Sequence, residues 1–165
     1  MKDFNYRENA AQVMKQVEEG AFLVVQSKDR ANVMTIGWAM LGFVWRRPIM
    51  MVAVRTSRFT HSVIEGADSF TVSVPTGNMK KEINFCGSKS GRELDKFKEC
   101  RLSTGKAKKV STPVLKIPGY HFECSIVYKT PLDPKSLSAE LEPIYPAKDY
   151  HTLYFGEIVA SYLTE

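Results

Sequence analysis

The sequence lacks the short motifs that mark the commonest enzyme classes. Its 165 residues contain no G-x-S-x-G, no H-E-x-x-H, no G-x-x-x-x-G-K and no G-x-G-x-x-G. These absences argue against serine hydrolases, zinc peptidases, P-loop proteins and Rossmann nucleotide sites. The three histidines, His61, His121 and His151, are isolated and lack the spacing of metal ligands. We therefore predict neither a metal site nor a catalytic acid or base.

Cysteine and long apolar runs are also scarce. Cys86, Cys100 and Cys124 are widely spaced and form no C-x-x-C pair, so we predict reduced thiols, with Cys124 packed in a strand and the other two able to reach solvent. No stretch approaches the roughly 18 apolar residues of a membrane span. The first residues, Met1–Arg7, lack a signal-peptide core. We expect a cytoplasmic protein with no membrane contact.

The composition is that of one globular domain. Hydrophobic residues make up 44% and charged residues 25% of the chain, and its length fits a single domain spanning 1–165. The net charge is +5, yet basic residues cluster only at Lys106, Lys108 and Lys109. A solvated hairpin is the favoured interpretation of this cluster. The alternative is a non-enzymatic small-barrel module whose basic edge binds nucleic acid, which we regard as the less favoured partner.

Hydrophobic patterning predicts a mainly β protein with a few short helices. Helices are expected over 10–19 after a capping Asn9, over 58–64 after a capping Ser57, and over 78–85. Runs of β-branched and aromatic residues predict strands. They are Ala21–Gln26, Asn32–Val44, Ile49–Arg55, Ser69–Val74, Tyr120–Tyr128 and Thr152–Tyr162. So many strands in a short chain favour a closed or partly closed antiparallel barrel.

Three segments carry further expectations. Ser69–Val74 alternates apolar and hydroxyl side chains, which predicts a strand with one buried face. Thr152–Tyr162 is apolar on both faces, so it lies either at the centre of the barrel or at a subunit contact, and a homodimer is the simpler explanation. The stretch from Lys129 to Tyr150 has four prolines and no clear periodicity, which predicts an extended surface excursion.

Two segments are candidates for ligand binding. In Asn32–Trp38, polar and small residues interrupt a buried strand, and Gly37 there marks either a β-bulge or a close approach of backbone to ligand. Arg55–His61 combines hydroxyl groups, guanidinium groups and a helix N-terminus, which can hold a phosphate without a P-loop. An ordinary cap with solvated arginines is the alternative. Together, the segments favour a planar cofactor that bears a phosphate.

Four motifs in a fixed order suggest a family. They are Asn32-x-Met34-Thr35-x-Gly37-Trp38, Arg55-x-Ser57-x-Phe59-Thr60, Cys86-Gly87-Ser88-x-Ser90-Gly91-Arg92-x-x-Asp95-Lys96-Phe97 and His151-Thr152-x-x-x-Gly156-Glu157. At these motifs the chain resembles the flavin reductase-like, FMN-binding split-barrel family, and within it the flavoredoxin-type proteins. The resemblance implies a split β-barrel of antiparallel Greek-key type.

The resemblance also implies FMN as cofactor, with NADH or NADPH as co-substrate. Asn32–Trp38 is then expected to lie along the isoalloxazine ring, the Arg55–Thr60 turn to hold the ribityl phosphate, Lys96 to lie near the ring, and His151 to lie where a nicotinamide can stack. The implied cofactor-binding residues are Asn32, Met34, Thr35, Ile36, Gly37, Trp38, Arg55, Thr56, Ser57, Phe59, Thr60, Ser90, Lys96 and His151.

The implied function is electron transfer from NAD(P)H or a redox protein partner through FMN. In a flavin-reductase version FMN is a substrate that is reduced and released, and in a flavoredoxin version it stays bound while a partner docks. The sequence leaves both open. Haem or a pyridoxal-type phosphate in the same barrel is a weaker option, because the segment after Arg92 matches the flavin group better.

Overall fold

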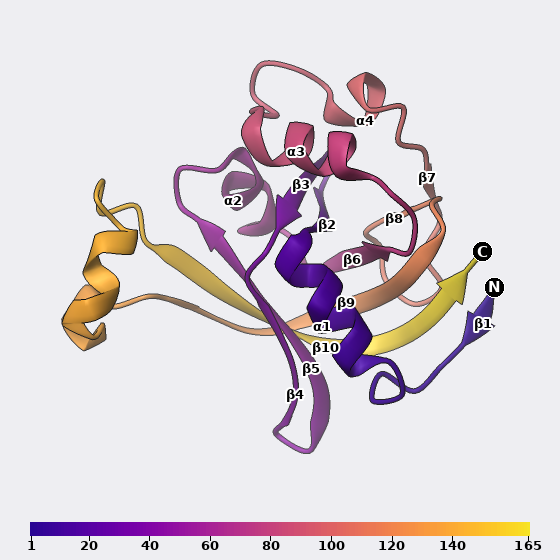
Figure 1. Cartoon of the computed structure of the whole chain (residues 1–165), viewed down its shortest axis with the longest axis horizontal. Coiled ribbons are helices and arrows are strands. Elements are labelled where there is room, and N and C mark those ends of the chain that lie inside the picture. The colour runs from indigo at the N-terminus through magenta and orange to yellow at the C-terminus, as the bar shows by residue number, and fades with distance from the viewer.

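An antiparallel sheet dominates the structure, a computed structural model that describes residues 1–165 (Figure 1). Its strands are β1 (Lys2–Asp3), β2 (Ala21–Ser27), β3 (Arg30–Ile36), β4 (Ala39–Val44), β5 (Arg47–Arg55), β6 (Ser69–Pro75), β7 (Thr104–Gly105), β8 (Val114–Leu115), β9 (Gly119–Pro131) and β10 (His151–Thr164). The helices are α1 (Ala10–Glu19), α2 (Phe59–Ile64), α3 (Lys80–Ser88), α4 (Lys96–Glu99) and the 3₁₀ helices η1 (Pro134–Ser136) and η2 (Ala139–Ile144). None of the helices has the length and apolar character needed to cross a membrane.

The link between β3 and β4 determines how the sheet curls. The strand order is β3-β2-β6-β9-β10-β5-β4, with β1 added to β10, so β3 and β4 are opposite edges. Only Gly37 and Trp38 separate them in sequence. Three Cα–Cα steps span at most about 11 Å, so the sheet must curl until its edges approach each other. The Ala53 N–H donates to the Trp38 carbonyl at 3.2 Å. The result is a barrel with one open seam at residues 37–38.

The prediction of one strand over Asn32–Val44 is therefore wrong. The predicted strand is instead two strands, divided at Gly37 and Trp38 between the two edges of the sheet. The other predicted strands are confirmed, with ends that differ by a few residues. β10 pairs with both β9 and β5, so it is central in the sheet. Only one of its faces is fully buried, however: Tyr154 and Ile158 lie in the core, whereas Val159 on the other face is 37% exposed.

Two apolar clusters bury opposite faces of the same strands. On β2, Leu23 and Val25 belong to the larger cluster, which α1 covers with Val13 and Val17. The alternate residues Phe22 and Val24 belong to a smaller cluster beneath α3. Burial on both faces accounts for the unbroken apolar run of this strand.

β6 is buried on both faces as well, so the predicted half-exposed strand is wrong. All seven of its residues are buried. The hydroxyl face is covered by the segment 111–121: Thr71 Oγ1 donates to the Pro113 carbonyl at 2.7 Å, and Ser73 Oγ lies 2.9 Å from His121 Nδ1. These long-range hydrogen bonds satisfy the hydroxyl groups and so allow polar side chains to lie in the interior.

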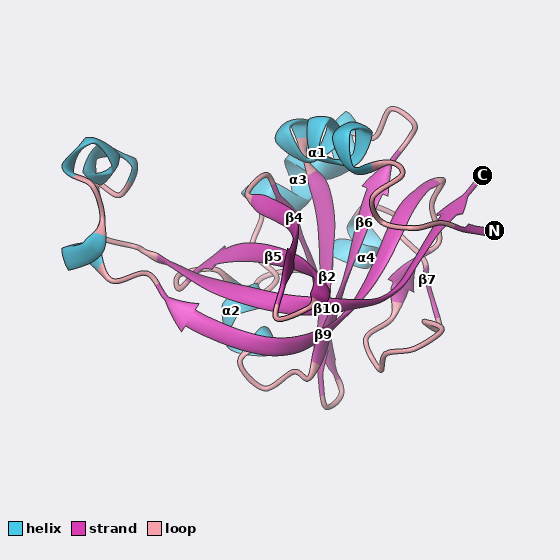
Figure 2. Cartoon of the chain, turned by 90° about the horizontal axis from the view of Figure 1, so that it is seen from below, coloured by secondary structure: helices cyan, strands magenta, loops and turns pink.

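The predicted helices form, but their predicted caps do not. Neither Asn9 before α1 nor Arg58 before α2 makes a side-chain capping bond, and the Ser57 side chain bonds elsewhere. α4 was not expected, and the Asp95 carboxylate caps it by accepting from the N–H groups of Phe97 and Lys98. The excursion between β9 and β10 carries η1 and η2 and projects from the body of the protein (Figure 2).

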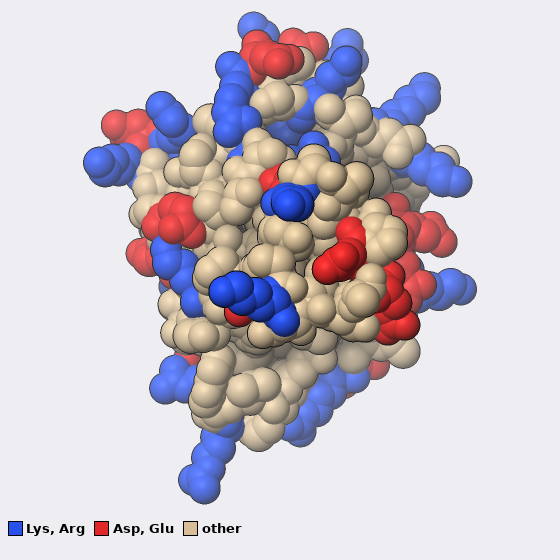
Figure 3. Space-filling model, turned by 90° about the vertical axis from the view of Figure 1, so that its left-hand side faces the viewer, with Lys and Arg blue, Asp and Glu red and all other residues tan.

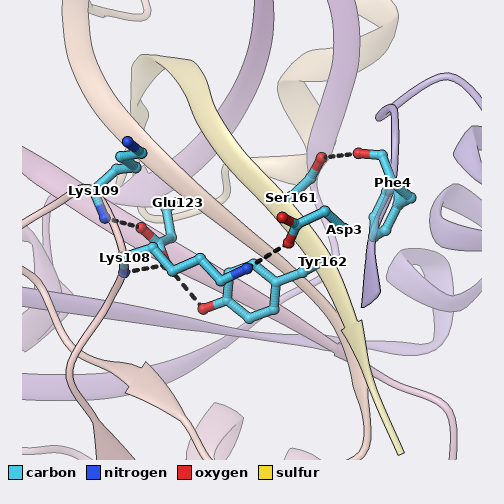
Figure 4. Close-up of polar contacts among 7 residues, drawn as sticks. All are labelled: Asp3, Phe4, Lys108, Lys109, Glu123, Ser161 and Tyr162. Carbon is cyan, nitrogen blue, oxygen red and sulfur yellow. Dashed lines mark hydrogen bonds and ion pairs between the residues drawn. The ribbon is translucent and has the colours of Figure 1, made fainter. Parts of the chain in front are cut away.

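A buried carboxylate fixes the other end of the barrel (Figure 4). Glu123 on β9 is fully buried, and it accepts from the backbone N–H groups of Lys108 and Lys109 at 2.8 and 2.7 Å and from the Tyr162 hydroxyl at 2.9 Å. The Lys108 ammonium pairs with Asp3 and lies 4.4 Å from the centroid of the Tyr162 ring. The basic cluster thus lies in the loop of the β7–β8 hairpin, as expected, and is anchored to the core by its backbone.

We predict that Glu123→Ala lowers the free energy of unfolding by about 3 kcal/mol or more, because two backbone donors and a buried hydroxyl lose their acceptor. Urea unfolding at fixed pH measures this. Glu140→Ala on exposed η2 is the matched control and should stay within about 0.5 kcal/mol of the parent. Equal stabilities of the two variants would contradict the anchoring role of Glu123.

Candidate functional site

Two adjoining cavities lie beside the open seam. Their volumes are about 280 and 270 Å³, and Met34 and Arg58 line both. The first cavity, called here the polar cavity, lies between the 57–60 turn and the segment after α3. The second, called the seam cavity, is lined by residues 34–38 together with Ala53, Arg55 and His151. Because they share these two side chains, the two cavities are neighbours, and together they form the candidate site.

The polar cavity is rich in cations and hydroxyl groups. Its lining is Asn32, Met34, Ser57, Arg58, Phe59, Thr60, Cys86, Gly87, Ser88, Lys89, Ser90, Gly91, Arg92, Glu93 and Lys96. The lining contains four positively charged side chains and one acidic side chain, Glu93. Arg58 Nη1 donates to the Gly87 carbonyl at 3.3 Å, and Arg92 Nη1 donates to the Ser57 carbonyl at 2.9 Å. These bonds tie the turn to the segment across the cavity, whose charge suits an anionic group.

Lys96 is the most enclosed of these cations. It is only 4% exposed, and its Nζ donates to the Cys86 carbonyl at 2.8 Å. Desolvation lowers the pKa of Lys96 from its ordinary value. Because an ammonium this enclosed has a single carbonyl acceptor within the chain, it has donors free for a ligand in the cavity.

Close packing leaves no room for a side chain at Gly91. An added Cβ there would overlap Asn32 Oδ1 and lie 2.6 Å from Phe59 Cδ1. Asn32 in turn donates from Nδ2 to Thr60 Oγ1 at 2.8 Å, inside the protein. Glycine at this position lets the 87–96 segment approach β3. Gly37 differs, because an added Cβ would meet only the Val17 carbonyl, at 3.8 Å; nothing in the chain itself requires glycine there.

An aromatic group closes one side of the seam cavity. The Trp38 ring lies 4.5 Å from the His151 ring, centroid to centroid, with 34° between the planes. The Tyr145 hydroxyl is hydrogen-bonded to His151 Nδ1 at 2.8 Å. Burial and the positive charge of Arg55 lower the pKa of His151 to about 4. The imidazole is therefore neutral at pH 7, and it contributes a planar surface to the cavity rather than a charge.

The excursion also reaches the turn after β5. The Asp149 carboxylate accepts from Thr56 Oγ1 at 2.9 Å, from the Ser57 N–H at 3.0 Å and from Ser57 Oγ. Arg55 donates to the carbonyls of Ile144 and Asp149 at 3.3 and 3.4 Å. Burial by itself raises the pKa of Asp149, but the hydrogen bonds from Ser57 and Thr56 outweigh it and lower the pKa. Thr56 and Ser57, which were expected to bind phosphate, therefore donate hydrogen bonds to the Asp149 carboxylate instead.

The structure brings together all but one of the residues predicted for the site. Thr56 is the exception, since it lines neither cavity and faces Asp149. Arg58, Lys89 and Arg92 were not among the predicted cofactor-binding residues, although Arg58 lies in the predicted phosphate-binding segment and Lys89 and Arg92 lie in the third motif. The sequence also allowed Cys86 to reach solvent, whereas Cys86 lies on the buried side of α3 and is only 1% exposed.

Comparison with known proteins places this geometry in a family. The family model described as a flavin reductase-like domain matches residues 14–165. An uncharacterized protein of Archaeoglobus fulgidus is 30% identical over 138 residues, which cover 84% of this chain and 68% of that protein. A flavoredoxin from Methanosarcina acetivorans has a TM-score of 0.70 at 26% identity, over 88% of this chain and 68% of the other. An FMN-binding protein from Thermus thermophilus has a TM-score of 0.67 at 23% identity, over 87% and 69%.

These matches confirm the predicted fold class, a mainly β split barrel. The matched region runs from within α1 to the end of β10, so it contains the seam, both cavities and the excursion. The chain belongs to the flavin reductase-like family.

Proposed function

We propose that the adjoining cavities bind FMN and that the protein passes electrons from NAD(P)H or a redox partner through it. The observation that carries this proposal is that a cationic, hydroxyl-rich cavity adjoins one lined by residues 34–38 and His151. FMN has the same division, with a phosphate dianion at one end and a planar ring at the other. The family match and the names of the flavoredoxin and FMN-binding structures support this ligand.

The residues present fit the phosphate end in the polar cavity. Arg58, Lys89 and Arg92 bring positive charge to its wall, and Ser90 and Thr60 add hydroxyl groups. Charged donors bind phosphate oxygens through short, strong hydrogen bonds. Arg58 lines both cavities, so its guanidinium lies where the phosphate-bearing chain would pass toward the ring.

The ring end fits the seam cavity. Residues 34–38 offer backbone groups beside the cavity, and the freedom around Gly37 allows a close approach. When bound, FMN supplies the two-electron chemistry at its ring. Neutral His151 and Trp38 provide a planar contact beside that ring, and the stack can shield it from water on that side.

The nucleic-acid alternative has less support. The Lys108 ammonium is paired with Asp3, and the backbone of Lys108 and Lys109 is bonded to buried Glu123. On the face that carries the excursion, acidic and basic residues are interspersed rather than gathered by sign (Figure 3). A single-stranded nucleic acid requires a continuous basic groove, and neither region provides one.

An absorbance spectrum of the purified protein reconstituted with FMN tests the proposal. We expect about one bound FMN per chain and bleaching of the flavin band on anaerobic addition of NADH or NADPH. Turnover of excess free FMN would identify the reductase version, and bound flavin without such turnover would identify the flavoredoxin version. Protein that ignores added FMN would refute both.

The charge of Arg58 should be needed for FMN affinity. We predict that Arg58→Gln weakens FMN by about 10- to 100-fold, since hydrogen bonds to charged groups contribute roughly 1.5–3 kcal/mol each. Titration of flavin fluorescence measures the change. Arg101→Gln, exposed and outside both cavities, is the control and should bind as the parent does. Riboflavin, which lacks the phosphate, should bind the parent and Arg58→Gln alike.

We further propose that the protein is a homodimer that pairs through the outer surface of β9, β10 and the β4–β5 hairpin. Trp45 and Tyr128 are 54% and 48% exposed, and both pack edge-on or tilted against Phe155 with ring centroids 6.0 and 5.7 Å apart. Trp45 and Arg46 form the hairpin turn with φ of 53° and 58°. Such a conformation disfavours bulky residues. A strained turn that presents an exposed aromatic cluster suits burial against a second copy.

The hairpin turn offers a sharp test of the dimer. Replacing Trp45 by Asn together with Arg46 by Gly gives the turn its preferred residues, which offsets the lost packing of Trp45, so the variant should still fold while the dimer dissociates. Light scattering coupled to size exclusion measures the mass. Lys28→Gly, at the positive φ of the β2–β3 turn, is the matched control and should leave the dimer intact. A dimeric double variant would overturn this interface.

A further inference from the structure

Two cysteines that are distant in sequence meet beside the polar cavity. Cys86 lies in α3 and is buried, and Cys100 directly follows α4 and is half-buried. Their Sγ atoms are 3.8 Å apart. Two sulfur atoms at this distance are in van der Waals contact, and a disulfide requires them to approach to about 2.05 Å. The two sulfur atoms must therefore move toward each other by about 1.8 Å.

The two cysteines flank the wall of the polar cavity. Residues 87–93 and Lys96, which lie between them in sequence, form that side of the cavity. Three hydrogen bonds hold the segment: Lys96 donates to the Cys86 carbonyl, Arg58 to the Gly87 carbonyl and Arg92 to the Ser57 carbonyl. A covalent bond between the flanking residues would close this segment into a ring.

We propose that Cys86 and Cys100 form a reversible disulfide that locks segment 87–99 as the wall of the polar cavity. The disulfide itself is independent of the ligand, and its effect on FMN rests on the proposed function. Closing the ring restricts the conformations open to the segment before a ligand arrives. A wall that is ordered in advance loses less entropy when the ligand binds.

A low-molecular-weight disulfide can serve as the oxidant. The Cys100 thiolate, the more accessible of the two, attacks one sulfur of the reagent, which releases one thiolate and leaves a mixed disulfide on Cys100. The Cys86 thiolate then attacks the Cys100 sulfur and expels the second reagent thiolate. Both reagent thiolates take up the protons lost by the two cysteines, so the protein pair is oxidised by two electrons and the reagent is reduced by two.

Burial controls the rate of this exchange. Desolvation raises the pKa of Cys86 to about 12 and raises that of Cys100 as well. Few thiolates are present at pH 7, so the reaction should accelerate as the pH rises toward 9. Cys124 is fully buried in the large core cluster, and desolvation raises its pKa too. It serves as an internal thiol that should not react in the folded protein.

Thiol counting on the full chain tests the disulfide. The reduced protein is incubated with glutathione disulfide at pH 8.5, then denatured, alkylated and mapped by mass spectrometry. We expect three free thiols before oxidation and one, Cys124, afterwards, with a linked peptide pair that dithiothreitol separates. Cys86→Ser should instead keep one glutathione adduct on Cys100. Three remaining thiols, or a lasting glutathione adduct on the parent, would overturn the proposal.

Two further measurements test the lock. Trypsin cleavage after Lys89 and Arg92, followed without ligand, should be several-fold slower in the oxidised protein. FMN should bind about 3- to 10-fold more tightly to the oxidised protein than to the reduced protein. Cys100→Ser should show neither effect of oxidant. A disulfide that changes neither measurement would refute the lock, whereas protected protein that fails to bind FMN in both forms would refute the proposed function alone.

Discussion

The two-residue link between β3 and β4 is the constraint on which the rest of the structure depends. Because Gly37 and Trp38 connect strands at opposite edges of the sheet, the sheet cannot remain open and flat. It curls around the larger apolar cluster, and its edges approach each other at a seam whose backbone is only partly paired. The candidate site lies at this seam, where residues 34–38 and the adjoining loops line two neighbouring cavities.

The site draws its chemistry from three segments that meet at the seam. Residues 34–38 supply backbone and Trp38, the turn after β5 supplies Arg58, and the segment after α3 supplies further cations. The excursion between β9 and β10 completes the arrangement, since Asp149 holds the turn and Tyr145 holds His151. At the other end of the barrel, buried Glu123 accepts hydrogen bonds from the backbone of the 106–113 loop. Different polar networks therefore stabilise the two ends.

Much of the fold could be read from residue patterns, and the exceptions have physical causes. The alternation in Ser69–Val74 is real, but Thr71 and Ser73 find partners in a segment far along the chain, so both faces are buried. In the run Asn32–Val44, Gly37 marked an irregularity but did not show that the chain passes there from one edge of the sheet to the other, because that depends on the pairing of distant strands. Ser57 has the chemistry of a cap, yet its side chain bonds to Asp149, which a local pattern cannot reveal.

The sequence by itself determined the mainly β architecture, the resemblance to a flavin-binding family and nearly all of the residues that line the site, because periodicity and motifs are local properties. Only the tertiary structure decided what those residues do with one another. The residues of the motif Asn32–Trp38 line two different cavities. The side chains of Thr56 and Ser57 are hydrogen-bonded to Asp149, and the Cys86 and Cys100 sulfur atoms are in contact. Each of these depends on contacts between distant segments, which the curl imposed at Gly37 and Trp38 brings together.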